Sequence, residues 1–167
     1  MRREIHPEPA KRHDIARAYA DPARLPASEP ERIALWLSLD RPDGMTDVVL
    51  AKVVAHGLPV TSAKVFFDAL KAASLSAPPI PEATLRRARK ARKPLPKEHS
   101  ERLYELSRVL DAVGRAYRGD TERMRAFLTR PHPMLGGETP FDLAGSSSAG
   151  ADAVVNLIRR AEAGVAA

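Results

Sequence analysis

The stretch EHSERLYELSRVLDAVGRAY, residues 98–117, decides the fold of this chain. Its apolar side chains recur at intervals of three and four residues, at Leu103, Leu106, Leu110, Val113 and Tyr117. That spacing places them on one face of an α-helix, so the stretch predicts a long amphipathic helix. Gly119 follows at a position where a helix commonly ends.

Shorter helices are predicted on both sides of this one, because polar residues stand where they can cap the first turn of apolar, helix-periodic segments. Before the long helix these are residues 29–39 with Ser28 as cap, 47–55 between Thr46 and Gly57, and a helix through Leu70 capped by Thr61 or Ser62. After it come 121–128 capped by Asp120, 140–143 capped by Thr139, and 149–163 ended by Gly164. Residues 74–81 hold three prolines and are predicted to form a loop.

The composition agrees with an all-α fold. Of the 167 residues, 44% are hydrophobic but only 5% are aromatic, so aliphatic side chains and alanine must form most of the core. Trp36 is the only tryptophan, and we expect its large surface to anchor residues 1–45 to the main body. The absence of cysteine excludes disulfides and thiolate zinc sites. With no signal-peptide pattern and no 18 consecutive apolar residues, we expect a cytoplasmic protein that does not span a membrane.

Positive charge is concentrated in one stretch of the chain. Between Ala83 and Lys97 no acidic residue interrupts seven basic ones, namely Arg86, Arg87, Arg89, Lys90, Arg92, Lys93 and Lys97. Without these seven, the chain's 27 basic residues fall to 20, against 21 acidic ones. The whole excess behind the net charge of +6 therefore lies here, which points to contact with a polyanion.

Residues 82–93 are predicted to be a basic helix that Pro94 and Pro96 end. One interpretation is a charged face that is merely solvated. The other is duplex DNA binding by Arg86, Arg87, Arg89, Lys90, Arg92 and Lys93, with Leu85 and Ala88 turned inward. Helices before and after it would then form a helix-turn-helix-like bundle.

No catalytic constellation is visible in the sequence. None of the five histidines stands in a zinc-binding spacing, so we expect no catalytic or metal-ligating residues and no cofactor. Ser146, Ser147 and Ser148 lack the context of a nucleophile and are better read as a loop that caps the last helix. Leu135-Gly136-Gly137 is better read as a tight turn than as a phosphate loop, since no Gly-Lys-Ser/Thr follows.

The same turn belongs to a longer pattern that resembles the toxin-binding domain of Xre/MbcA/ParS antitoxins. That pattern is an aromatic residue and leucine, then Pro-Asn-x-x-Leu-Gly-Gly-x-Thr-Pro-x-x-Leu, a glycine, a valine-bearing helix and a further glycine. Here it reads Phe127-Leu128, Pro131-His132, then Leu135, Gly136, Gly137, Thr139, Pro140 and Leu143, followed by Gly150, Val154 or Val155, and Gly164. Two residues depart from it, since His132 replaces asparagine and Phe127 replaces tryptophan.

Upstream, Gly57-Leu58-Pro59-Val60 and the segment 101–110 are similar to the family's Xre-like domain. The resemblance implies three regions: an N-terminal helical arm of residues 1–45, a degenerate helix-turn-helix domain of residues 46–112, and a toxin-binding domain of residues 113–167. The proline-containing loop 74–81 stands where the family has a full helix, and the interval is about two turns too short.

The function that the resemblance implies is that of a type II antitoxin. Its partner would be a RES-domain toxin that consumes NAD⁺ or transfers ADP-ribose, and the antitoxin would occlude that toxin's active site. The expected contact is Arg159, Arg160 and Glu162 on the last helix, followed by a tail of Gly164, Val165, Ala166 and Ala167 that either enters the toxin's cleft or frays. Operator DNA, a homodimer and a hetero-oligomer with the toxin are further expected partners, and the protein would not be an enzyme. The alternative is a stand-alone helix-turn-helix transcriptional regulator.

Overall fold

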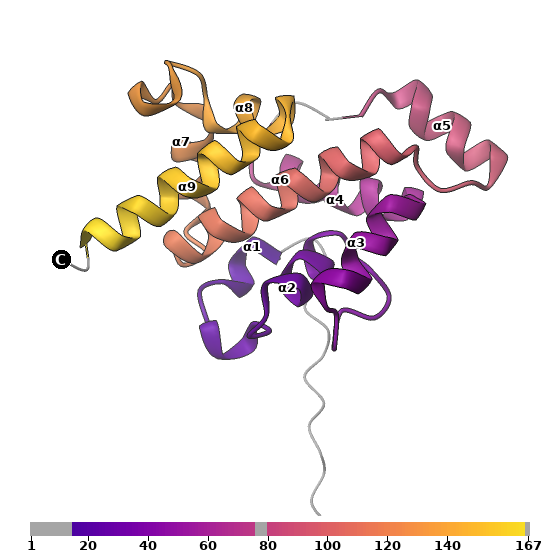
Figure 1. Cartoon of the computed structure of the whole chain (residues 1–167), viewed down its shortest axis with the longest axis horizontal. Helices are drawn as coiled ribbons and strands as arrows, with labels where there is room; N and C mark the ends of the chain where they lie inside the picture. The colour runs from indigo at the N-terminus through magenta and orange to yellow at the C-terminus, as the bar shows by residue number, and fades with distance from the viewer. Residues whose placement is uncertain (1–14, 76–79, 166–167) are drawn as a thin grey trace, which may run out of the picture.

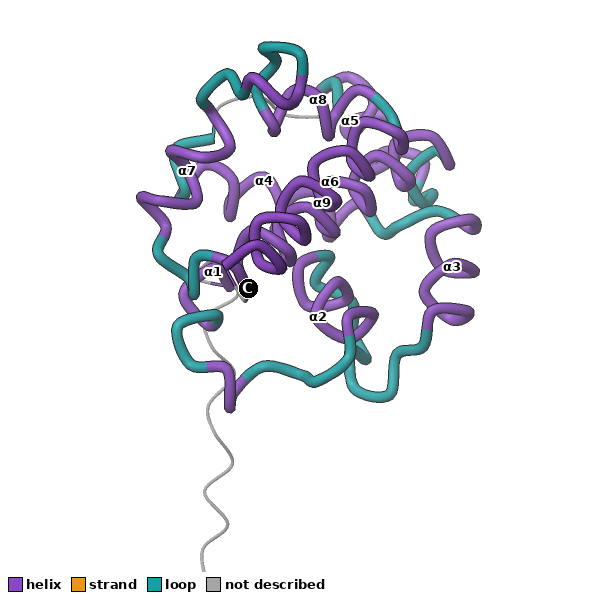
Figure 2. The backbone as a smooth tube through the Cα atoms, turned by 60° about the vertical axis from the view of Figure 1, so that its left-hand side comes forward, coloured by secondary structure: helices purple, strands orange, loops and turns teal. Residues whose placement is uncertain are grey.

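The computed structural model describes residues 15–75 and 80–165, and in this part of the chain the predicted all-α fold is confirmed (Figure 1). The described residues form nine α-helices and two short 3-10 helices, with no β-strand. Two long helices, α6 (Lys97–Ala116) and α9 (Ser148–Val165), pack against each other along the length of the molecule. The other helices surround this pair (Figure 2).

Helix α6 is the predicted long helix, and its apolar stripe is the centre of the core. Leu103, Leu106, Leu110 and Val113 are all buried, as their spacing predicts. The helix begins one residue earlier than predicted and ends at Ala116, so the half-buried Tyr117 is its C-cap. Gly119 follows with a φ of +71°, a conformation that favours glycine.

The N-terminal part consists of α1 (Ile15–Ala18), the 3-10 helix η1 (Pro22–Arg24), α2 (Glu29–Trp36), α3 (Asp47–His56) and α4 (Val60–Ala72). The predicted caps Ser28 and Thr46 are confirmed, because their hydroxyl oxygens accept the backbone N–H groups of Glu31 and Val49. Helix α2 is shorter than predicted, since Ser38 has a φ of +51° that no helix residue adopts.

The predicted start of α4 is wrong. The helix begins at Val60 after Pro59, which has no side chain able to cap it, and neither Thr61 nor Ser62 is the N-cap. Proline nevertheless suits this place, because its fixed φ directs the chain into the first turn. Ser62 instead lies inside the helix with its side chain fully buried.

Trp36 anchors the N-terminal part to the core, as predicted. Its ring is 4% exposed, and its indole N–H donates to the Tyr19 hydroxyl over 2.8 Å. That hydroxyl donates in turn to the carboxylate of Asp111 on α6, over 2.7 Å. Burial, and then the charge of Asp111, raises the pKa of Tyr19. The tryptophan thus contributes both apolar area and a hydrogen-bonded link to the central helix.

The remaining helices are α5 (Glu82–Ala91), α7 (Thr121–Thr129), the 3-10 helix η2 (Pro133–Leu135) and α8 (Pro140–Ser146). Asp120 caps α7 as predicted, its carboxylate accepting the Arg123 N–H over 3.1 Å. Helix α5 ends two residues before its predicted end, because Arg92 takes a left-handed conformation and closes it. Lys93 therefore lies beyond the helix, and of the predicted loop 74–81, residues 76–79 lie outside the described residues.

Candidate functional site

The segment with the Leu-Gly-Gly-x-Thr-Pro pattern is a compact hydrogen-bonded loop between α7 and α8. The backbone N–H of His132 donates to the Glu138 carbonyl over 3.0 Å, and the His132 carbonyl accepts from Leu135 and Gly137. Gly136 and Gly137 have φ values of +67° and +83°, so two successive residues need a conformation that side chains disfavour. The predicted tight turn is confirmed, and Leu135 buries its side chain beneath it.

Thr139 and Pro140 begin helix α8 in the predicted manner. The Thr139 hydroxyl oxygen accepts the Asp142 N–H over 3.1 Å and donates its own proton to the Asp142 carboxylate over 2.7 Å. Pro140 occupies the first helical position, where its missing N–H costs nothing. The helix runs on to Ser146 rather than ending at Leu143, which is half-buried against the core.

Gly150 allows the close approach of α8 and α9. A Cβ atom at this position would collide with the backbone carbonyl oxygen of Leu143 in the middle of α8. Ser147 caps the start of α9, since its hydroxyl oxygen accepts the Gly150 N–H over 3.0 Å. The predicted capping of the last helix is therefore confirmed for Ser147, but the three serines do not form a loop, since Ser146 ends α8 and Ser148 begins α9. The role of Gly150 is to fix how α9 leaves α8.

Helix α9 packs one side on the core and exposes the other. Val154, Leu157 and Ile158 are buried as predicted, together with Ala151 and Val155. Ala161 follows Ile158 at helical spacing but is exposed, because the last turns of α9 extend past the helices that cover its first part. Arg159, Arg160 and Glu162 are exposed, as their spacing predicts.

The predicted helix stop at Gly164 is wrong. Helix α9 continues through Gly164 to Val165, with Gly164 exposed in its last turn. A helix of this length, packed on α6 and α8, tolerates one glycine, whose cost is about 1 kcal/mol relative to alanine. The predicted tail of Gly164, Val165, Ala166 and Ala167 therefore begins inside the helix, and Ala166 and Ala167 lie outside the described residues.

Ion pairs hold α9 to its neighbours. The Arg108 guanidinium of α6 lies 3.0 Å from the Asp152 carboxylate of α9 and 2.7 Å from that of Glu105. Burial is the largest single influence and would lower the pKa of Arg108, but the hydrogen bonds and negative charge of its acidic partners, Glu105 above all and then Asp152, together raise that pKa. Arg159 lies 4.0 Å from Glu29 of α2, with both side chains well exposed. The exposed side of α9 thus combines Asp152, Asn156, Arg159, Arg160 and Ala163 at helical spacing.

The second candidate surface is the basic helix α5. Its predicted cations Arg86, Arg87, Arg89 and Lys90 are all exposed, as are Arg92 and Lys93 directly after it. None of the six forms an ion pair with any residue that the structure describes. Ala88 is buried and Leu85 half-buried, as expected. The helix therefore presents uncompensated positive charge to solvent.

Helix α5 is attached to the body mainly at its two ends. Ile80 before it and Leu95 after it are both buried, and the Leu95 N–H donates to the Leu58 carbonyl over 2.9 Å. Gly57 has a φ of +112°, and a Cβ atom there would collide with the Leu95 carbonyl oxygen. The turn between α3 and α4 is thus shaped to receive the segment that follows α5.

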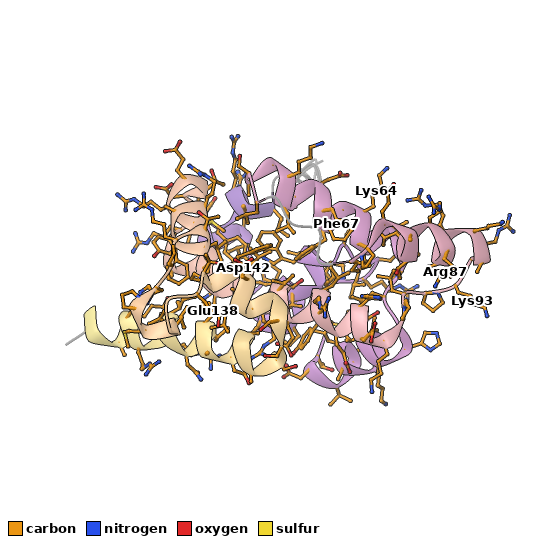
Figure 3. The ribbon with its side chains drawn as sticks, turned by 90° about the horizontal axis from the view of Figure 1, so that it is seen from above. Lys64, Phe67, Arg87, Lys93, Glu138 and Asp142 are labelled. Carbon is orange, nitrogen blue, oxygen red and sulfur yellow. The ribbon has the colours of Figure 1, made fainter. Side chains whose placement is uncertain are left out.

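Helix α4 is the described helix that precedes α5. Between the two, the described residues 73–75 and 80–81 form no helix, and residues 76–79 lie outside the described residues. Helix α4 packs against α5 and carries the exposed Lys64, a cation outside the basic stretch (Figure 3).

The two candidate surfaces lie at opposite ends of the molecule. In Figure 1, α5 stands at one end of the long axis and the last turn of α9 at the other. Figure 3 shows the same separation, with Arg87 and Lys93 at the α5 end and Glu138 and Asp142 in the other half.

Sequence reasoning missed several residues of these surfaces. The exposed side of α9 carries Asp152, Asn156 and Ala163 as well as Arg159. Helical spacing could have identified them, because Asn156, Arg159 and Ala163 follow Asp152 by four, seven and eleven residues. Glu29 lies next to Arg159 only through packing of α2, and no local signal indicates that contact.

No three histidine, aspartate or glutamate side chains among residues 15–75 and 80–165 lie together as metal ligands would. In the same residues, no single helix is long and apolar enough to cross a membrane. Helices α3 and α4 taken together reach that length and apolar composition, but the chain bends by 105° between them.

Comparison with known families gives a match for the segment that contains most of α9. Residues 110–164 match the model of the antitoxin Xre/MbcA/ParS C-terminal toxin-binding domain, so the resemblance seen in the sequence is confirmed over this segment. No curated protein and no solved structure gave a significant match.

Proposed function

We propose that this chain is the antitoxin of a type II toxin–antitoxin system, and that it neutralises a RES-domain, NAD⁺-consuming toxin by covering its active site. The observation that carries the proposal is that the matched toxin-binding segment, residues 110–164, contains the whole loop, α8 and most of α9. The match supports a toxin partner and a regulator rather than an enzyme. The RES identity of the toxin and the occlusion of its site are our inference.

The exposed side of α9 is the surface that we assign to the toxin. Its buried side is packed on α6 and α8, and the glycine turn and Gly150 fix its direction. A surface held this rigidly loses little conformational entropy on binding. Arg159 and Arg160 project from it, and arginine is a residue type enriched among the strong contacts of protein interfaces.

The end of α9 completes the proposed contact. Because α9 continues to Val165, Gly164 would reach the toxin as part of a helix rather than as the first residue of an extended tail. The exposed Glu162, Ala163 and Gly164 lie in its last described turn, beyond the core, where a toxin surface can approach from several sides.

Helix α5 is the surface that we assign to operator DNA. Six exposed cations that form no ion pair with a described residue are available to neutralise phosphates, which would make binding strongly dependent on salt. Because α5 and the end of α9 lie at opposite ends of the molecule, DNA and toxin can bind at the same time (Figure 1). The same free cations favour the second candidate, a stand-alone DNA-binding regulator.

The toxin experiment uses charge reversal on α9. The chain is co-expressed with the toxin encoded beside it, and NAD⁺ consumption by the purified complex is measured. The double variant Arg159→Glu, Arg160→Glu should release toxin activity and weaken the complex at least tenfold, as expected for central arginines. A matched control, Arg86→Glu with Arg89→Glu on α5, should leave the toxin inhibited. Equal inhibition by both variants would overturn the assignment of α9.

The DNA experiment uses the same two surfaces in reverse. Binding to the operon's own promoter is measured over a series of salt concentrations. Replacing Arg86, Arg89 and Lys90 with glutamine should reduce the salt slope by about three, whereas the α9 variant should leave it unchanged. If the wild-type chain shows no salt-dependent DNA binding, α5 is a solvated face. If it binds promoter DNA but no toxin, the stand-alone regulator is the correct function.

A further inference from the structure

A cavity of about 370 Å³ lies between α1, α4 and α7, away from both surfaces described above. Its apolar lining includes Leu70 of α4, Leu110 of α6, Met124 and Leu128 of α7, and the ring of Trp36. Figure 2 shows α1, α4 and α7 on the same side of the molecule. The volume lies at the lower end of the range of small-molecule sites in proteins.

The charged residues that the structure describes in the cavity lining are both basic. Arg17 and Arg125 line it and are both exposed, which places them at its mouth, and no described acidic side chain is part of the lining. Arg125 forms no ion pair with any described residue. Thr121, at the start of α7, adds a hydroxyl group to the lining. An apolar floor beneath a cationic mouth complements a ligand with an apolar body and an anionic end.

We propose that this cavity binds an aliphatic carboxylate of medium length, with its chain against Trp36, Leu110 and Leu128 and its carboxylate at Arg125. The size follows from the volume, since about 30 Å³ per water-sized group gives room for about twelve heavy atoms. Decanoate has ten carbons and two oxygens and is therefore the probe of matching size. The guanidinium of Arg125 supplies charge-assisted hydrogen bonds to the carboxylate.

The site links two parts of the chain. Leu110, Thr121, Met124, Arg125 and Leu128 belong to the segment matched by the toxin-binding family, whereas the residues from α1, α2 and α4 precede it. A bound carboxylate would therefore stabilise the packing of the N-terminal helices on α7. Binding is independent of the proposed toxin and DNA contacts, so the full chain alone is enough to test it.

The first test is a chain-length series. Hexanoate, octanoate and decanoate are added to the full chain below the concentrations at which they form micelles. Binding is followed by calorimetry and by the fluorescence of Trp36, which is the only tryptophan and lines the cavity. One site should saturate, and affinity should rise about fifteenfold for every two methylene groups, since each buried methylene contributes about fourfold. Longer chains should gain nothing further, because the cavity is full.

The second test separates the charge from the chain. Decanol should bind at least tenfold more weakly than decanoate, and Arg125→Gln should remove most of that difference. The matched control is Arg123→Gln, an exposed arginine of the same helix that does not line the cavity. Ala73→Leu, which places a larger side chain in the cavity, should abolish binding while circular dichroism reports the fold.

Several results would overturn the proposal. These are binding that does not saturate, affinity that does not depend on chain length, equal binding of decanol and decanoate, and unchanged binding by a folded Ala73→Leu variant. A change in Trp36 fluorescence when the toxin binds, with no carboxylate binding to the free chain, would overturn the proposal and assign the cavity to a protein partner.

Discussion

Arg32 of α2 and Asp111 of α6 form a buried, two-pronged ion pair. The Arg32 Nε lies 2.8 Å from Asp111 Oδ1 and its Nη2 lies 3.2 Å from Oδ2, with the two side chains only 8% and 3% exposed. Arg32 also donates through Nη1 to the carbonyl oxygens of Pro26 and Ala27. One guanidinium therefore holds both the loop before α2 and the middle of the central helix.

Breaking this pair should strongly destabilise the fold. Arg32→Ala leaves a buried carboxylate without its cation, which costs about 3–5 kcal/mol, a large part of the stability of a typical domain. The measurement is urea unfolding followed by circular dichroism. Arg24→Ala, which removes the exposed pair with Asp21 on the same arm, is the control and should cost less than about 1 kcal/mol. Similar losses in the two variants would contradict the role given to the buried pair.

The Tyr19 hydroxyl should make the fold sensitive to alkaline pH. Burial and the Asp111 carboxylate raise its pKa in the folded chain, so the folded state keeps a proton that the unfolded state releases near pH 10. This contribution is fully present below pH 10 and is lost as the pH rises, at up to about 1.4 kcal/mol per pH unit. Urea unfolding between pH 8 and 11.5 measures it.

Tyr19→Phe is the matched variant for that measurement. It should be less stable at pH 8 by about 1–3 kcal/mol, because the buried indole N–H of Trp36 loses its acceptor. Its stability should fall less steeply above pH 10 than that of the wild type. Parallel curves for the two proteins would show that Tyr19 does not control the alkaline loss.

The two glycines of the signature turn are required for their backbone conformation. Gly136→Ala and Gly137→Ala should each destabilise the chain by about 1–2 kcal/mol, because both positions have positive φ. An added Cβ atom would touch nothing within 4 Å at either position, so the loss would come from the backbone conformation and not from a collision. Gly145→Ala in α8 is the control and should stabilise by up to about 1 kcal/mol, because that position is helical and open. Thermal unfolding compares the three. Equal effects at all three would refute the conformational explanation.

Gly164 offers a test of where α9 ends. As a helical, exposed residue, it should tolerate alanine, and Gly164→Ala should increase stability by a few tenths to about 1 kcal/mol. A left-handed helix stop would respond in the opposite sense, with a loss of about 1 kcal/mol or more. Helical circular dichroism and thermal unfolding of the two proteins decide between these outcomes.

The sequence alone was sufficient for features whose causes lie within one or two helical turns. The stripe from Leu103 to Val113, the caps Ser28, Thr46, Asp120 and Thr139, and the turn at Gly136-Gly137 depend on neighbours a few residues away. The same local pattern also carried the resemblance that the family comparison confirms for residues 110–164. The division into residues 1–45, 46–112 and 113–167 stays a prediction, as do the toxin- and DNA-contacting residues.

Only the tertiary structure decided how distant segments meet. Arg32 and Asp111 stand 79 positions apart, and nothing in either neighbourhood indicates that one neutralises the other. Packing also decided that Ala161 is exposed and that Gly164 remains helical, because what covers the end of α9 depends on where the surrounding helices stop. The opposite placement of α5 and α9, and the cavity beside Trp36, arise in the same way. Helical periodicity and capping act over a few residues, whereas burial and charge pairing depend on all the elements that share a core.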